Sequence, residues 1–332
     1  MHPARPSPGS TLSRPWLALL GAALAGLAAS SLLGAAPADA GDAPRELGRV
    51  DWNRDFEAGI AQAQQTERPV FLLFQEVPGC STCVNFGEGA LSHALMVEAI
   101  ETAFVPVAVF NNKGGEDAAV LRRYREPSWN NPVVRFVDAS GADLIPRRDG
   151  VYHTSKLAPR MRAALAAANR PVPAYLDWLI EEHELAPTAQ ATFVTHCFWE
   201  GEVCFGSDPA VRKTRASWHQ GREVVEVWFD PAQTTYEALV ERAKARGCAD
   251  AVVSLDASQE RIARGIFGND VLAARGRPRK APEKDQKRHL RASKLRGLEL
   301  TALQATRVNA ALADRQDPRP WLSPRQRAQV GL

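Results

Sequence analysis

Residues 70–83 read VFLLFQEVPGCSTC, an apolar run that turns into a pair of cysteines. Five apolar residues in succession, from Val70 to Phe74, predict a strand buried on both faces. Pro78-Gly79 predicts a turn after it. The pair Cys80-Ser81-Thr82-Cys83 then opens a predicted helix, and a helix N-terminus stabilises negative charge on a thiolate. We therefore expect a redox-active dithiol between a central strand and a helix.

The segments around this stretch form a regular order of elements. Apolar residues recur at helical spacing over residues 52–60, before the central strand. Apolar runs at 105–110 and 133–137 predict two further strands, and the alanine-rich segment 156–169 predicts a closing helix. The order is helix, strand, CxxC at a helix start, strand, helix, strand, helix.

This order resembles the thioredoxin fold over residues 41–170. The resemblance implies that Cys80 is the attacking thiol, that Cys83 resolves the mixed disulfide, and that Pro132 forms a cis peptide bond beside them. A CxxC pair suits this chemistry because the thiolate is the attacking species and the second thiol displaces the first partner. The sequence departs from the family in having Pro78-Gly79, and not tryptophan, before the first cysteine.

A second set of elements follows between residues 191 and 257. Its predicted strands are 191–195, 212–218, 223–229 and 251–255, and its predicted helices are 198–205 and 235–246. The order βαββαβ predicts a ferredoxin-like α/β sandwich. The fold class is therefore α/β, a thioredoxin fold followed by this sandwich.

Residues 195–201, THCFWEG, lie where the first of these strands gives way to a helix. Together with the strand that begins at Glu223, they resemble methionine sulfoxide reductase A. The resemblance implies that Cys197 is a nucleophile, that Phe198 and Trp199 hold the substrate methyl group, and that Glu223 protonates the sulfoxide oxygen. A carboxyl group near apolar rings is suited to that step because burial favours its protonated form.

The match to that family has gaps. His196 stands in place of its glycine, and the long segment between the second and third strands is absent. The alternative is that Cys197 and its two aromatic neighbours are simply a buried core cluster, and the matching Glu223 strand favours a reactive cysteine over it. Cys204 and Cys248 are candidate resolving thiols. If Cys197 and Cys204 share one helix, they lie roughly 10 Å apart, too far for a disulfide unless the helix start unwinds.

The N-terminus predicts a secretory signal peptide over residues 1–40. Arg5 and Arg14 provide positive charge, an apolar run follows, and Ala38-Asp39-Ala40 fits the rule for a cleavage site. We expect export to the periplasm or the extracellular space, with no membrane span after cleavage. Disulfides persist in such compartments, and with five cysteines at least one thiol is left over.

The remaining segments are a predicted linker helix at 171–190 and a basic tail at 258–332. We expect the tail to be a solvated linker followed by a helix, whose start at Thr301 and Gln304 fits a capping box. The net charge of the whole chain is only +3, which gives no general argument for nucleic-acid binding.

The leading hypothesis is an exported enzyme that reduces methionine S-sulfoxide with Cys197 and Glu223 and is recharged by Cys80 and Cys83. It needs no cofactor or metal, and its partners are an oxidised protein or peptide and an external thiol or disulfide donor. One alternative is a thiol–disulfide oxidoreductase that uses only the CxxC pair, with the second domain as a binding module. Another is a soft-metal site of both CxxC cysteines and His93.

Overall fold

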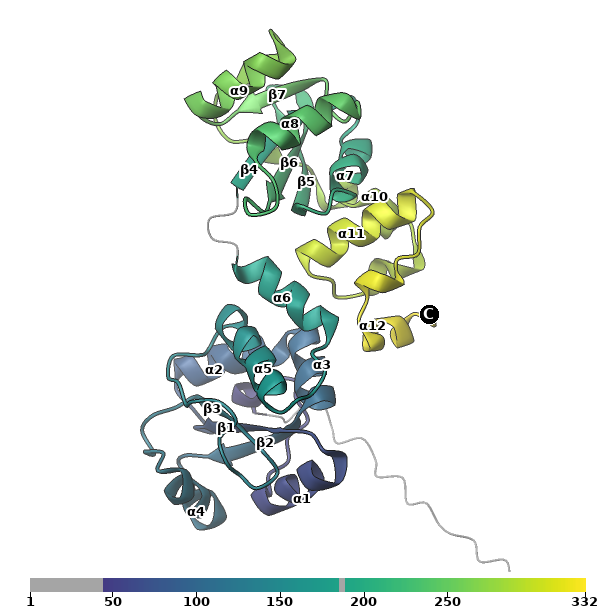
Figure 1. Cartoon of the computed structure of the whole chain (residues 1–332). Helices are drawn as coiled ribbons and strands as arrows, with labels where there is room; N and C mark the ends of the chain where they lie inside the picture. Colours follow the sequence, from purple (N-terminus) through teal and green to yellow (C-terminus); the bar gives the residue numbers. More distant parts are fainter. Residues whose placement is uncertain (1–43, 185–188) are drawn as a thin grey trace, which may run out of the picture. The chain divides into compact units, whose positions relative to one another are not determined.

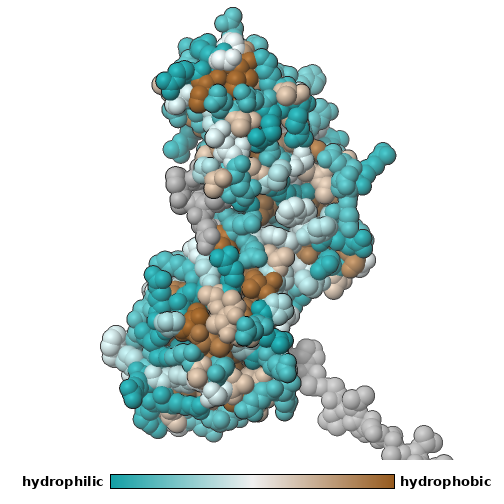
Figure 2. Space-filling view, viewed as in Figure 1, coloured by the Kyte–Doolittle hydropathy of each residue, from teal (hydrophilic) through white to brown (hydrophobic). Residues whose placement is uncertain are grey.

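The computed structural model describes residues 44–184 and 189–332 and has two separate β-sheets, each packed against helices (Figure 1). The predicted signal peptide lies outside these residues. Within them, every helix is too short or too polar to cross a bilayer. Hydrophilic side chains dominate the face drawn in Figure 2, with hydrophobic ones in small groups. The architecture is α/β, as predicted.

The first sheet has the order β2-β1-β3. Its central strand β1 (Val70–Gln75) is buried at every residue, as the apolar run predicts. It runs parallel to β2 (Val105–Phe110) and antiparallel to β3 (Val133–Val137).

Helices cover this sheet on both faces. They are α1 (Phe56–Thr66), α2 (Ser81–Glu88), α3 (Ala94–Ala103), α4 (Gly115–Tyr124) and α5 (Thr154–Ala167). Alternate side chains of a strand point to opposite faces. Accordingly Phe71 and Leu73 join an apolar cluster with α3 and α5, whereas Leu72 and Phe74 join one with α1 and α4.

Helix α6 (Ala174–Glu184) differs from the expected linker helix. Its apolar side chains, Tyr175, Leu176, Leu179 and Ile180, are buried in the same cluster as Phe71. The helix is therefore part of the first core, because its apolar residues recur on one face and need a partner.

The second sheet has the order β8-β7-β4-β6-β5-β9. Its first four strands in sequence are β4 (Ala189–Val194), β5 (Val211–His219), β6 (Arg222–Phe229) and β7 (Ala251–Ser254). Neighbours among these four are antiparallel. Side chains of α7 (Phe198–Gly206) and α8 (Tyr236–Ala245) share one apolar cluster with the sheet. This arrangement confirms the predicted ferredoxin-like sandwich.

The chain after residue 257 is not the linker that its composition predicts. Helix α9 (Ala257–Phe267) begins at the N-cap Asp256 and buries Ala263 and Phe267 against the sheet. Strand β8 (Val271–Ala273) then pairs with β7 in parallel, and β9 (Arg279–Lys280) pairs with the opposite edge strand β5. The segment of α9 is rich in charged residues, but the helix also has an apolar face, which packs on the sheet and extends the sandwich.

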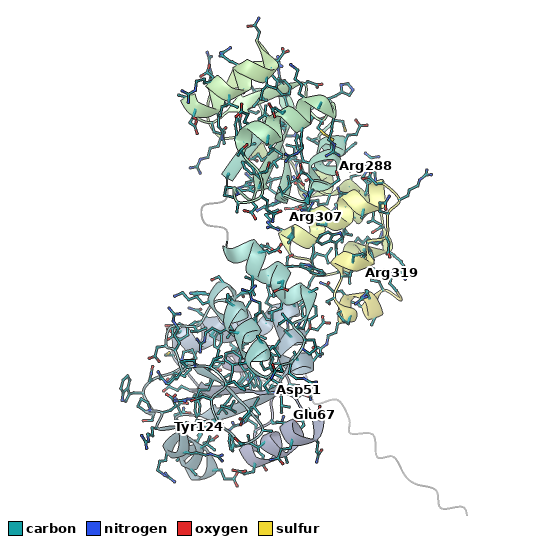
Figure 3. The ribbon with its side chains drawn as sticks, viewed as in Figure 1. Asp51, Glu67, Tyr124, Arg288, Arg307 and Arg319 are labelled. Atoms are coloured by element: carbon teal, nitrogen blue, oxygen red, sulfur yellow. A yellow bond between two sulfur atoms is a disulfide. The ribbon has the colours of Figure 1, made fainter. Side chains whose placement is uncertain are left out.

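The last segment contains α10 (Arg288–Arg291), α11 (Ala302–Ala313) and α12 (Pro324–Gln329). The capping box at Thr301 is confirmed. Two basic side chains of this last segment, Lys287 and Arg307, point toward the protein interior. Lys287 forms a buried ion pair with Glu202, and the Arg307 guanidinium, labelled in Figure 3, is buried among backbone carbonyls. Burial lowers the pKa of Arg307 to about 10. The basic tail is therefore part of the packed structure.

Candidate functional site

The two cysteines of the CxxC pair lie at the start of α2, just after the turn that follows β1. Cys80 is the N-cap residue of α2 and is exposed, whereas Cys83 is in its first turn and fully buried. Their Sγ atoms are 3.4 Å apart. The site thus presents one accessible sulfur, with the second, buried sulfur 3.4 Å from it.

The turn before Cys80 is held tightly. The Gly79 N–H donates to Oε1 of Glu46 at 2.7 Å, and the Gln75 amide donates to the backbone carbonyls of Glu46 and Cys83. A Cβ atom at position 79 would lie 2.3 Å from the Glu76 carbonyl oxygen and 2.7 Å from Cβ of Cys83. Only glycine fits there, which explains why a turn residue precedes the cysteine.

The surroundings push the pKa values of the two thiols in opposite directions. The backbone N–H of Cys83, at the start of α2, bonds to the Cys80 sulfur and lowers the pKa of Cys80, while the nearby Glu76 charge opposes this. Burial, together with the Cys80 sulfur, raises the pKa of Cys83 to about 12. Cys80 therefore ionises more readily than an ordinary cysteine, and Cys83 holds its proton more tightly.

The segment before β3 lies against this pair. The Asn131–Pro132 peptide bond is cis, in agreement with the expectation for Pro132. The Cys83 thiol donates to Oδ1 of Asn131 at 2.8 Å. Asn131 was not singled out from the sequence, although its position directly before the cis-proline could have indicated it.

A third group also lies close to the sulfurs. The potential metal-ligand atoms of Glu76, Cys80 and Cys83 all lie within 4.8 Å of one another. In the described residues, this is the cluster of His, Cys, Asp or Glu side chains that could hold a metal ion. His93, the third ligand expected for a soft-metal site, is not part of it. Two sulfurs and one carboxylate could bind a soft or borderline cation.

The second cysteine site lies at the start of α7. Cys197 is the N-cap residue of this helix and is half-buried. Oε2 of Glu223, at the start of β6, accepts the backbone N–H of Phe198 at 2.7 Å. The sheet therefore brings Glu223 to the helix end that carries Cys197.

The two aromatic rings of this site are engaged by other protein groups. Phe198 is buried and packs edge-to-face on Trp218, with ring centroids 5.6 Å apart. The Trp199 indole donates to the carbonyl of Asp285 at 3.0 Å, and the guanidinium of Arg288, labelled in Figure 3, lies 3.9 Å over its ring. The rings expected to hold a substrate methyl group thus contact protein in this structure.

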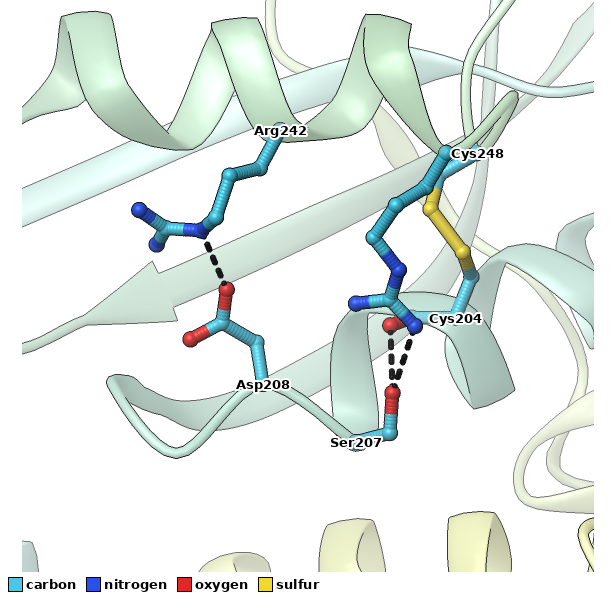
Figure 4. Close-up of a disulfide and its surroundings, with 6 residues drawn as sticks. Cys204, Ser207, Asp208, Arg242 and Cys248 are labelled. Atoms are coloured by element: carbon cyan, nitrogen blue, oxygen red, sulfur yellow. Dashed lines mark hydrogen bonds and ion pairs between the residues drawn. A yellow bond between two sulfur atoms is a disulfide. The ribbon is translucent and has the colours of Figure 1, made fainter.

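Cys204 and Cys248, the expected resolving thiols, are bonded to each other (Figure 4). Their disulfide links α7 to the segment between α8 and β7, with a Cα–Cα distance of 5.8 Å. The free thiols are Cys80, Cys83 and Cys197. The pairing could not be predicted from spacing, because it depends on how the end of α8 packs beside α7.

Comparison with known proteins bears on the first of these sites. Residues 51–139 match the family model described as thioredoxin-like. No curated protein matches the chain. Among solved structures, a protein titled "DsbH Oxidoreductase" shares 16% identity over 37% of this chain and 90% of its own, with a TM-score of 0.30. The family match covers β1, β2, β3 and the dithiol and leaves the second sheet outside it. Residues 51–139 are therefore a thioredoxin-like domain.

Proposed function

We propose that the protein is a thiol–disulfide oxidoreductase that works through Cys80 and Cys83. One observation carries this proposal, namely two sulfurs 3.4 Å apart of which one is exposed and the other buried. The lowered pKa of Cys80 makes it a thiolate more readily than an ordinary cysteine, and the raised pKa of Cys83 keeps that residue a thiol until it is needed.

The reaction proceeds in two exchanges. The Cys80 thiolate attacks one sulfur of a partner disulfide, the partner's S–S bond breaks, and the departing thiolate takes up a proton. Cys83 then gives up its proton and attacks the Cys80 sulfur, which releases the second partner thiol and leaves a Cys80–Cys83 disulfide. The partner gains two electrons, and an external thiol donor returns the pair to the reduced state.

The test is reduction of a small disulfide and of insulin, with glutathione as the external thiol. The wild-type chain turns over both, Cys80→Ser loses activity by on the order of 10³-fold or more, and Cys83→Ser accumulates a mixed disulfide on Cys80. Cys197→Ser is the matched control and keeps full activity. Turnover that survives Cys80→Ser contradicts the proposal.

Reduction of methionine S-sulfoxide by Cys197 is the second candidate function. The observation that favours it is the Glu223 carboxyl, which bonds the backbone N–H next to Cys197. Glu223 would give the sulfoxide oxygen a proton while the Cys197 thiolate attacks the sulfur. Methionine leaves, and Cys197 is left as a sulfenic acid. Because Cys204 and Cys248 are bonded together, the reductant would be Cys80, which forms a mixed disulfide with release of water before Cys83 resolves it.

Turnover of a methionine sulfoxide peptide with dithiothreitol separates the two functions. If the second function holds, Cys197→Ser abolishes this turnover and Cys80→Ser spares it, because dithiothreitol replaces the dithiol. An absence of turnover in the wild-type chain removes the second function and leaves the first intact.

The setting of the reaction is also a proposal. The predicted signal peptide supports export to the periplasm or the extracellular space, where the partners would be oxidised proteins and an external thiol donor. The grouping of Glu76 with the two cysteines supports a non-enzymatic alternative, capture of a soft metal. Zinc or copper that stays with the reduced chain through gel filtration and is lost in Cys80→Ser would favour it.

A further inference from the structure

We infer that the loop bearing Trp129 and the basic hollow beside it form a docking face for an extended, acidic segment of the oxidised partner protein. This inference rests on the proposed thiol–disulfide exchange and specifies its substrate. The face is defined by Trp129 and by the hollow that Arg148, Lys156 and Arg160 line.

Trp129 is the most exposed large apolar side chain in the described parts of the chain, at 80%. It lies two residues before Asn131, so its Cα is at most about 8 Å from that of the residue whose side chain meets the Cys83 thiol. Tryptophan gains much free energy when its large surface is covered, and it is enriched where proteins bind partners. Its place beside the dithiol is suited to contact with a bound partner.

The loop around Trp129 is well anchored. The Asn130 N–H donates to the Pro127 carbonyl, and the Asn111 amide donates to the carbonyl of Asn130. The Asn130 amide also donates to Oδ1 of Asp149 at 2.9 Å. Since the residues on either side of the ring are held, little conformational freedom is lost when a partner covers it.

The hollow adjoins this loop through Asp149, which contributes to its wall. Its volume is about 330 Å³, and its lining residues are Arg148, Asp149, Gly150, Val151, Lys156, Pro159 and Arg160. The Asp149 carboxylate is already engaged by Arg147 at 2.8 Å. Three cationic side chains therefore outnumber one compensated carboxylate, and a carboxylate of a partner would be attracted there.

The charges fix how a partner segment would lie. Glu76 is next to Cys80, so an acidic side chain directly over the dithiol would meet a like charge. The acidic residue is favoured at the hollow, whose lining residue Asp149 accepts a hydrogen bond from the Asn130 amide. The occupant is thus a segment with its cysteine at Cys80, an apolar group on Trp129, and an acidic residue a few positions along.

The test uses two disulfide peptides that differ only in having acidic or basic residues beside the cysteine. The control substrate is bis(2-hydroxyethyl) disulfide, which is too small to contact the docking face while it reacts at Cys80. We expect the wild-type chain to reduce the acidic peptide with a kcat/KM about 10-fold higher, a preference that shrinks with added salt. Trp129→Ala should raise KM for both peptides about 5-fold and leave the small disulfide unaffected. Leu255→Ala removes another exposed apolar side chain, outside the thioredoxin-like domain, and serves as its control.

The double variant Arg148→Glu/Lys156→Glu should abolish or reverse the preference for the acidic peptide. Arg261→Glu, a charge change at an exposed site on α9, is the matched control and should keep it. Equal kcat/KM for the two peptides, or an unchanged KM in Trp129→Ala, overturns the docking face while the small disulfide is still reduced. If the wild-type chain does not reduce the small disulfide, the proposed function itself fails, and the docking face fails with it.

Discussion

Cys80 and Cys197 occupy the same kind of position in two different sheets. Each is the N-cap residue of the helix that follows a buried strand, α2 after β1 and α7 after β4. At the first, a second thiol stands 3.4 Å away and the sulfur is exposed. At the second, the neighbours are a carboxylate and two aromatic rings in contact with other protein groups.

The difference lies in what accepts the free N–H groups of each helix end. In α2 a backbone N–H bonds to the Cys80 sulfur, and the pKa of Cys80 is lowered. In α7 the N–H of Phe198 is taken by the Glu223 carboxylate. The two helix ends therefore differ in the groups that bind their free N–H groups, a thiol sulfur in α2 and a carboxylate in α7. The following experiments test that contrast, beginning with the largest effect.

Alkylation of the reduced chain at pH 7 should separate the two thiols of the CxxC pair most strongly. Because burial raises the pKa of Cys83 to about 12, this residue is almost entirely a thiol at pH 7. Cys80 should therefore react with iodoacetamide orders of magnitude faster than Cys83, with Cys197 between them. Peptide mass spectrometry at timed quenches gives the three rates. Equal rates for Cys80 and Cys197 would break the comparison.

Replacing both disulfide cysteines, as in Cys204→Ser/Cys248→Ser, should lower the free energy of unfolding by about 2–4 kcal/mol. Urea unfolding measures this change. Insulin reduction through Cys80 should be unaffected, because the disulfide belongs to the other sheet. A loss of sulfoxide turnover without a loss of stability would instead identify one of these cysteines as a resolving thiol.

Asn131→Ala should lower the pKa of Cys83 by about 0.7 unit, since a hydrogen bond worth about 1 kcal/mol favours the thiol form. The rate of the second exchange, in which Cys83 attacks the Cys80 sulfur, should then begin to rise at a lower pH than in the wild-type chain. Stopped-flow release of the second partner thiol, measured from pH 7 to 10, reports the shift. Asn112→Ala, next to the same turn but without a contact to Cys83, is the control.

Glu223→Ala should cost about 1 kcal/mol of stability, because the N–H of Phe198 loses its acceptor and the helix end loses a favourable charge. Thermal unfolding measures it, and Glu223→Gln, which keeps an acceptor, should recover part of the loss. Dithiol activity should not change in either variant. If Cys197 becomes more reactive toward iodoacetamide in Glu223→Ala, the contrast between the two helix ends is sharpened.

The sequence predicts most of the fold because local patterns carry it. The run Val70–Phe74 is a central strand, and the order βαββαβ is a ferredoxin-like sandwich. The prediction of a solvated tail was wrong because composition gives the number of charged side chains but not whether they point into the protein or into solvent. In the sequence, Lys287 and Arg307 look the same as solvated basic residues, and only the packing against α7 shows that they point inward.

The candidate site divides in the same way. Cys80 and Cys83 could be found from a local motif, whereas Pro132 was predicted from the resemblance to the thioredoxin fold. Asn131 could have been indicated by its place before Pro132, but its contact with the Cys83 thiol is seen only once the segment before β3 lies beside α2. Arg288 lies over the ring of Trp199 although the two residues are far apart in the sequence, and a local sequence pattern cannot predict such a contact.

The Arg307 guanidinium donates to the carbonyls of Gly206, Asp208, Pro209 and Val211, across separations of 96 to 101 residues. During synthesis those carbonyls emerge long before their partner does. The first sheet, by contrast, has all its strands once residue 137 has been made. The thioredoxin-like domain can therefore fold early, while the second sandwich must wait for α11. A truncation before residue 307 would remove the guanidinium that these four carbonyls share, and the Asp208 carbonyl would keep only the N–H of Val211.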